Sequence, residues 1–209
     1  MPMDQPYLIG VAGPSGSGKS EMARRVSAIL TARIISIDCY YRHLPQLSFE
    51  ERTRVNYDEP DALDHDLLST QLAALVDGNE IEVPTYDFTR HLRGTEVQRV
   101  RAGRFVVIEG LFALYWEDVR RLLGTKVFVE LPDEMCFARR LERDIRDRGR
   151  SIESVIEQYA ATVRPMAEQY VLPTRASADV VVSGCDPIEN SVRAVLGHIE
   201  QHRQRAAVH

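Results

Sequence analysis

The most informative residues lie near the N-terminus, in a run that fits the phosphate-loop pattern G-x-x-x-x-G-K-S/T. Glycines in such a loop let backbone N–H groups converge on phosphate oxygens, and the following helix adds its positive dipole end. Lys19 is placed to reach the β- and γ-phosphates, and the Ser20 hydroxyl to ligate Mg²⁺. We therefore predict that a nucleoside triphosphate binds at Gly13, Ser15, Gly16, Ser17, Gly18, Lys19 and Ser20.

Two carboxylates stand at the ends of apolar, strand-like runs. The run 106–108 followed by Glu109 looks like a Walker-B strand, whose terminal acid holds Mg²⁺ directly or through water. The alternative is that Glu109 only caps a turn. Asp38 follows another such run, where ligand sites of parallel sheets gather, and could take a proton from an attacking hydroxyl. Taken alone, an Asp in that position is more often a turn residue or a helix cap.

A dense basic run follows the strand-like segment 126–130. Its arginines alternate with Glu142, Asp144 and Asp147, a mixture that is typical of a solvated helix face. In a chain that also has a phosphate loop, we favour a lid whose arginines stabilise charge on the transferring phosphoryl group. Gly149 would give this lid its bend. The arginines are Arg139, Arg140, Arg143, Arg146, Arg148 and Arg150.

The elements that must position these residues alternate between short apolar runs and amphipathic helical patterns. This alternation indicates a parallel sheet covered by helices, and strands that are apolar throughout are buried on both faces. We predict an α/β fold, a P-loop NTPase-type three-layer sandwich with a parallel central sheet. The predicted strands are Tyr7–Ala12, Arg33–Ile37, Phe105–Glu109, Lys126–Glu130 and Val180–Val182.

Helices are predicted in the gaps between the strands. Pro165 should kink or interrupt the fourth of them, because proline removes a helical hydrogen bond. The tail after about Gln201 is expected to fray. The helices run from the phosphate loop to about Leu30, from about Asp61 to Asp77, from Asp133 onward, from near Ser151 onward, and from a capping box at Asp186 onward.

One region breaks the alternation. Residues 81–83 and 95–100 have strand patterns, joined across residues 84–94. In the second run, Thr95, Val97 and Arg99 alternate with Glu96, Gln98 and Val100, so one face of this strand cannot be wholly apolar. We interpret it as a β-hairpin flap over about residues 81–100 that stands off the main sheet, with an irregular surface loop as the alternative.

Length and composition fit one domain. Given the phosphate loop and the basic run, we expect a single P-loop kinase domain over 1–209, with an arginine-rich helical lid over about 139–158. The net charge of −5 argues against a general nucleic-acid binder. Three separated cysteines suit a reducing cytoplasm. The N-terminus lacks the basic start of a signal peptide, and the longest apolar stretch, 105–116, is too short to span a bilayer. We expect a cytoplasmic protein with no nucleic-acid or membrane partner.

From Tyr7 to about His198 the chain resembles the uridine/cytidine kinase family. Besides the phosphate loop, the resemblance rests on several motifs in family order. These are Ile37-Asp38-Cys39-Tyr40-Tyr41-Arg42, Asn56-Tyr57-Asp58-Glu59-Pro60-Asp61-Ala62-Leu63-Asp64, Pro84-Thr85-Tyr86-Asp87-Phe88-Thr89-Arg90-His91, Glu109-Gly110 and Arg143-Asp144-Ile145-Arg146-Asp147-Arg148-Gly149-Arg150.

The resemblance implies ATP- and Mg²⁺-dependent phosphorylation of the 5′-hydroxyl of uridine and cytidine, in pyrimidine salvage, by a homo-oligomer that is often a tetramer. It implies that Asp38 is the base, that Asp58 holds the ribose hydroxyls with Arg140 nearby, and that Arg143 and Arg148 contact ATP phosphates. The implied residues of the base and acceptor pockets are Tyr41, Tyr86, Phe88, His91, Arg150 and Gln158.

The sequence departs from the family at three positions. Ser20 stands where threonine is common, which preserves the hydroxyl. Glu59 stands where histidine is common, and Arg90 fills a flap position that is usually small or acidic, so that it could alter access to the base pocket.

Two other functions fit a phosphate-loop chain. One is a kinase of the same architecture that acts on a phosphorylated sugar or a vitamin precursor, which would need a basic acceptor pocket or no base-stacking flap. The other is a regulatory nucleotide switch, but the N-K-x-D signature of guanine-specific switches is absent. Turnover that requires a nucleoside would separate an enzyme from a switch.

Overall fold

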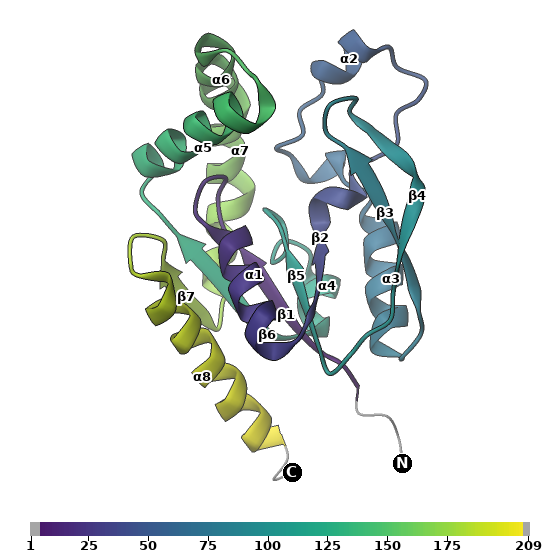
Figure 1. The fold of residues 1–209 in the computed structure, drawn as a ribbon, viewed down its shortest axis with the longest axis vertical. Helices are drawn as coiled ribbons and strands as arrows, with labels where there is room; N and C mark the ends of the chain where they lie inside the picture. Colours follow the sequence, from purple (N-terminus) through teal and green to yellow (C-terminus); the bar gives the residue numbers. More distant parts are fainter. Residues whose placement is uncertain (1–4, 207–209) are drawn as a thin grey trace.

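A computed structural model describes residues 5–206, and its centre is a five-stranded sheet in the order β2-β5-β1-β6-β7. Every neighbouring pair in this sheet is parallel, which confirms the predicted α/β class (Figure 1). The strands are β1 (Tyr7–Ala12), β2 (Arg33–Ser36), β5 (Phe105–Glu109), β6 (Leu123–Glu130) and β7 (Val180–Ser183).

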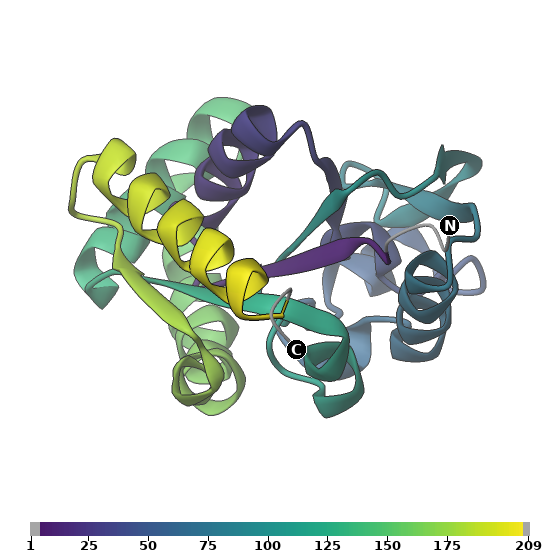
Figure 2. The same cartoon turned by 90° about the horizontal axis from the view of Figure 1, so that it is seen from below.

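Helices cover both faces of the sheet, giving the predicted three layers (Figure 2). On one face Val26 and Val195, from two neighbouring helices, pack with Val107 of β5. On the other face Leu68 and Phe112 lie in a second, larger core. The α-helices are α1 (Lys19–Leu30), α2 (Phe49–Thr53), α3 (His65–Val76), α4 (Glu117–Leu122), α5 (Asp133–Arg148), α6 (Ile152–Gln158), α7 (Arg164–Met166) and α8 (Ile188–Ala206).

The predicted hairpin forms a separate two-stranded antiparallel sheet, β3 (Ile81–Asp87) with β4 (Leu92–Val100). Both strands extend further toward the turn than predicted, because the ladder resumes after a register shift between Pro84 and Tyr86. Proline has no N–H to donate, so within sheets it is confined to edge strands, strand starts and bulges. The tip is therefore only residues 88–91.

Several predicted boundaries were wrong. The second strand ends at Ser36, and Ile37–Tyr40 forms a 3-10 turn, so Asp38 lies in that turn. Residues 60–62 also form a 3-10 turn, and α3 begins only at His65 because the Asp64 side chain accepts a hydrogen bond from the Leu67 N–H at 3.3 Å. The short helices α2 and α4 were not predicted, and β6 starts directly after α4, before Lys126.

The chain after Ser151 is helical but irregular, as expected from Pro165. A π-helical turn, Tyr159–Val163, precedes α7, and a second, Ala167–Val171, follows it. By contrast, the predicted fraying after Gln201 is wrong, because α8 continues to Ala206. Its last turns are held by His202, whose Nδ1 lies 3.1 Å from the Tyr7 hydroxyl. Within residues 5–206, no helix combines the length and apolar character that a membrane crossing needs.

Candidate active site

The phosphate loop joins β1 to α1, and two of its glycines are required by its shape. Gly16 has φ 88°, and a Cβ there would lie 2.4 Å from the Cys136 carbonyl oxygen of α5. Gly18, with φ 99°, is the N-cap of α1. Ser17 Oγ is buried and has no hydrogen-bond partner among the described residues. A loop with left-handed glycines and an unpaired inward hydroxyl suits an anion held by backbone donors.

The predicted metal ligands lie together at the carboxyl ends of the strands. Glu109 accepts hydrogen bonds from Ser20 Oγ at 3.1 Å and from Ser36 Oγ at 3.0 Å. No group of three His, Cys, Asp or Glu side chains suited to a metal occurs within the described part of the chain. Mg²⁺ typically takes only one or two protein oxygens and keeps waters and phosphate oxygens, so the residues present fit this ion.

Lys19 and Asp38 share the electrostatic field of Glu109. Burial lowers the pKa of Lys19, and the charges of Glu109 and Asp38 oppose that shift. Burial raises the pKa of Asp38, and the charge of Lys19 is the main opposing influence. The structure thus brings the predicted base, the phosphate-loop lysine and the predicted metal ligand to one edge of the sheet.

Helix α5 lies close to the phosphate loop (Figure 1), and two of its arginines contact the loop. Arg140 Nη1 donates to Ser15 Oγ at 3.0 Å, and Arg143 Nη2 approaches the same oxygen at 3.5 Å. Arg148 is partly exposed, and its guanidinium carbon lies 5.9 Å from the centroid of the Phe88 ring in the flap. The predicted lid residues therefore contact both the loop and the flap.

Asp58 is buried, and one arginine lies within reach of both its carboxylate and the phosphate loop. Its Oδ2 accepts a hydrogen bond from Thr162 Oγ1 at 3.2 Å, and its Oδ1 lies 3.8 Å from Arg140 Nη1. Arg140 also donates to Gln158 Oε1 at 3.1 Å, and Arg150 donates to the same oxygen. Arg140, the predicted neighbour of Asp58, thus lies beside it. Thr162 was missed, because it is 104 positions away along the chain and no local pattern marks it.

Aromatic side chains form the wall between Asp58 and the flap. The Tyr41 ring lies 5.2 Å from both Tyr57 and Tyr86, and Tyr86 lies 5.2 Å from Phe88. His91 stacks on Tyr57 at 5.0 Å with an interplanar angle of 16°. Burial, together with the charges of nearby arginines, lowers the pKa of His91 and so favours its neutral imidazole. Tyr57 is part of this wall and was not among the predicted site residues.

Two arginines that the sequence analysis did not single out connect segments on the acceptor side of the site through hydrogen bonds. Arg93 of β4 donates to the Tyr41 carbonyl at 2.8 Å and lies 3.0 Å from Asp64 Oδ2. Arg52 of α2 donates to the Arg90 carbonyl at 3.0 Å. Both look like ordinary surface cations in the sequence, because their acceptors are distant backbone carbonyls.

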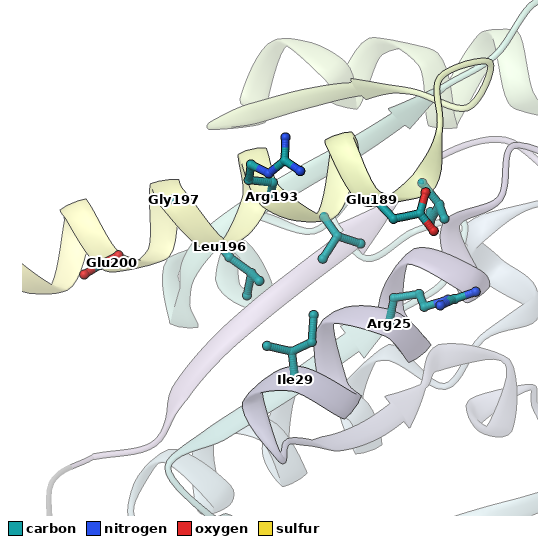
Figure 3. A pocket seen from close by; sticks show the side chains of 9 residues that line it. Arg25, Ile29, Glu189, Arg193, Leu196, Gly197 and Glu200 are labelled. Carbon is teal, nitrogen blue, oxygen red and sulfur yellow. The ribbon is translucent and has the colours of Figure 1, made fainter.

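A second, apolar groove of about 460 Å³ lies between α1 and α8. Figure 3 shows Ile29 and Leu196 on its walls and Arg25, Glu189 and Arg193 at its rim. It contains none of the predicted site residues, so the region around the phosphate loop, Asp38 and Asp58, and not this groove, is the candidate active site.

Comparison with known proteins adds two close relatives. A uridine kinase of Lactobacillus helveticus (strain DPC 4571) is 43% identical over 184 residues, 86% of this chain and 87% of that protein. A uridine kinase of Chloroflexus aggregans (strain MD-66 / DSM 9485) is 43% identical over 205 residues, 97% of this chain and 98% of that protein.

A family model and a solved structure agree with these matches. The model described as "Phosphoribulokinase / Uridine kinase family" matches residues 8–187. The structure of phosphoribulokinase from Rhodobacter spheroides superposes with a TM-score of 0.62 at 16% identity, covering 89% of this chain and 75% of that one. At that identity the superposition shows a shared fold.

Proposed function

The chain belongs to the phosphoribulokinase/uridine kinase family, and on this basis we propose that it transfers the γ-phosphoryl group of ATP to the 5′-hydroxyl of uridine or cytidine. The products are ADP and UMP or CMP. The observation that carries the proposal is the position of Arg140. One guanidinium reaches Ser15 of the phosphate loop at 3.0 Å and Asp58 of the opposite wall at 3.8 Å. A donor phosphate and a ribose would therefore lie within reach of one side chain.

On the donor side, the loop amides and Lys19 bind the phosphates, and Arg143 and Arg148 neutralise charge that develops on the transferring group. Ser20 and Glu109 would hold Mg²⁺, which when bound supplies further charge compensation to the phosphate oxygens. Most of this work is positioning and electrostatic stabilisation, since phosphoryl transfer needs little covalent chemistry from the protein.

On the acceptor side, Asp38 accepts the proton of the 5′-hydroxyl as the 5′-oxygen attacks the γ-phosphorus. The bond from that phosphorus to the bridging oxygen breaks, and ADP leaves. The raised pKa of Asp38 suits this role, because a base whose pKa lies nearer the working pH accepts a proton more readily. Asp58, held by Thr162 and Arg140, accepts hydrogen bonds from the ribose 2′- and 3′-hydroxyls.

The aromatic wall supports a pyrimidine nucleoside over the alternative acceptors. Tyr86 and Phe88 offer ring surface to a flat neutral base, and His91 offers one donor and one acceptor nitrogen. A phosphorylated sugar would need available cations on this wall. Arg52 and Arg93 instead donate to protein carbonyls.

We also propose, from the resemblance alone, that the protein is a cytoplasmic homo-oligomer. Light scattering would measure the mass of the oligomer.

The test is incubation with MgATP and a panel of nucleosides, sugar phosphates and pantothenate, with products identified by mass. We expect UMP and CMP, and ADP release that depends on nucleoside. Lys19→Met is the control for contaminating kinases. Phosphorylation of a sugar phosphate alone would contradict the proposed acceptor, and ADP release that no acceptor stimulates would contradict a kinase.

A further inference from the structure

Asp144 differs from the other acids of α5. Glu142 and Asp147 are exposed, with side-chain accessibilities of 74% and 48%, whereas the Asp144 side chain is 0% exposed. Four arginines surround its carboxylate. The atoms and distances are Arg143 Nη2 at 2.9 Å, Arg148 Nη1 at 3.3 Å, Arg140 Nε at 3.4 Å and Arg150 Nη1 at 3.7 Å.

The backbone of Asp144 builds the turn that closes this cluster. Its carbonyl accepts hydrogen bonds from the N–H of Gly149 and, at 3.1 Å, from the N–H of Arg150. Gly149 has φ 63°, which glycine adopts without strain. The turn ends α5 and brings Arg148 and Arg150 back over the carboxylate that lies one turn earlier.

The arginines of this cluster need a shared negative counter-charge. Arginines this close repel each other, and the pKa of Arg148 is lowered first by burial and then by Arg143, with Asp144 opposing the shift. A carboxylate shielded from water is costly unless cations compensate it. The carboxylate and the guanidiniums therefore stabilise each other, and two of these arginines, Arg140 and Arg143, reach Ser15 of the phosphate loop.

We propose that Asp144 is the positioning residue of the lid. Its carboxylate holds Arg143 near the phosphate loop and Arg148 near the flap before the donor binds, so that charge on the transferring group meets cations already in place. Asp144 touches neither substrate and acts through these arginines. The inference rests on the proposed kinase function but not on the identity of the acceptor.

The first test compares Asp144→Asn with Asp147→Asn. Both remove one negative charge from the same helix, but only Asp144 is surrounded by lid arginines. We expect Asp144→Asn to lower kcat by about 100-fold, the scale for losing a preorganised stabiliser, and Asp147→Asn to lower it less than about 3-fold. The dissociation constant for ATP should change much less than kcat. Equal kcat values in the two variants would overturn the proposal.

The second test is a double-mutant cycle with Arg148→Ala, which separates positioning from a general structural role. If Asp144 acts through Arg148, then Asp144→Asn should cost less than about 10-fold in the Arg148→Ala background, since residues that act as a unit are not additive. An undiminished loss in that background would mean that Asp144 only supports the fold.

Asp144→Glu covers the case in which the Asn variant does not fold. It keeps the charge but moves it by one methylene, so we expect a folded protein with kcat lowered by about 10-fold and the same non-additivity with Arg148→Ala. Additive losses would again reject the positioning role. The cycle uses whichever acceptor the wild type phosphorylates best, so a wrong acceptor assignment and a wrong role for Asp144 give different results.

Discussion

The donor and acceptor sides of the candidate site, called its two walls here, are built in different ways. The donor wall is a six-residue loop between a buried strand and a helix, and its shape follows from glycines at fixed positions. The acceptor wall is irregular, with two 3-10 turns, the short helix α2 and a detached hairpin. Long-range side-chain contacts hold it, such as those of Arg93 with Tyr41 and of Thr162 with Asp58.

This difference indicates how each wall can change. In the proposed function backbone amides bind the phosphates on the donor wall, so we expect few side-chain substitutions to change its ligand without destroying the loop. The acceptor wall presents side chains on a scaffold of exposed backbone, and function tends to vary in such segments. We therefore expect substitutions on the acceptor wall to change which molecule is phosphorylated, and substitutions on the donor wall to change how fast.

Asp38 stands where the walls meet, and its removal should have the largest effect. We expect Asp38→Asn to lower kcat by about 10²- to 10⁴-fold, the range for a positioned base, with little change in nucleoside affinity. Burial raises the pKa of Asp38, so the rate of the wild type should fall as the pH drops through a value above the ordinary carboxyl range. The rate of the Asp38→Asn variant should not show this fall at low pH. A variant with near-normal kcat, when chemistry is rate-limiting, would rule out this role.

Asp58 tests whether the acceptor wall sets selectivity. A carboxylate that receives two hydroxyls is left partly unpaired by a deoxy sugar, so wild-type kcat/KM should favour ribonucleosides by about 10- to 1000-fold. Water in an open cleft can fill part of the gap, which limits the ratio. Asp58→Ala should remove most of the preference by weakening the ribonucleosides. An unchanged ratio, measured with cytidine and deoxycytidine, would assign Asp58 a structural role.

Glu109 tests the donor wall alone. It anchors Ser20, so Glu109→Gln should raise the Mg²⁺ concentration needed for half-maximal rate by about 10- to 100-fold, as for other residues that orient metal ligands. The uridine-to-cytidine ratio should stay the same, because no acceptor contact changes. Titration of the rate with Mg²⁺ at fixed ATP measures the shift. A changed uridine-to-cytidine ratio would contradict the expectation that the donor wall does not affect acceptor selectivity.

The smallest effect should be the discrimination between the two bases. The lowered pKa of His91 favours the neutral imidazole, which can present a donor or an acceptor according to its tautomer and so can meet either the uracil carbonyl or the cytosine amino group. One exchanged hydrogen bond is worth about 1–3 kcal/mol, so we expect the kcat/KM values for uridine and cytidine to lie within about 100-fold. Steady-state rates with each nucleoside decide this, and turnover of only one base would refute it.

The sequence predicted the donor wall better than the acceptor wall, for a physical reason. The spacing of Gly13, Gly18 and Lys19 is local, and buried parallel strands have a clear apolar pattern, so the loop and the sheet could be predicted from short windows. The contacts of Thr162 and Arg93 depend on how distant segments meet, and no short window contains both partners. Asp144 looked like its exposed neighbour Asp147 because both lie among arginines, and only the packing of α5 separates them.

The flap makes no strand pairing with the parallel sheet. We therefore expect its backbone amides to exchange with deuterium independently of those of the parallel sheet. Its hydrogen bonds can open while β1 and β5 stay closed, so its amides should exchange by local opening, well before those of the central strands. A base packed against Tyr86 and Phe88 would oppose that opening. Deuterium uptake in residues 81–100 would then report occupancy of the acceptor wall directly, even in variants that no longer turn over.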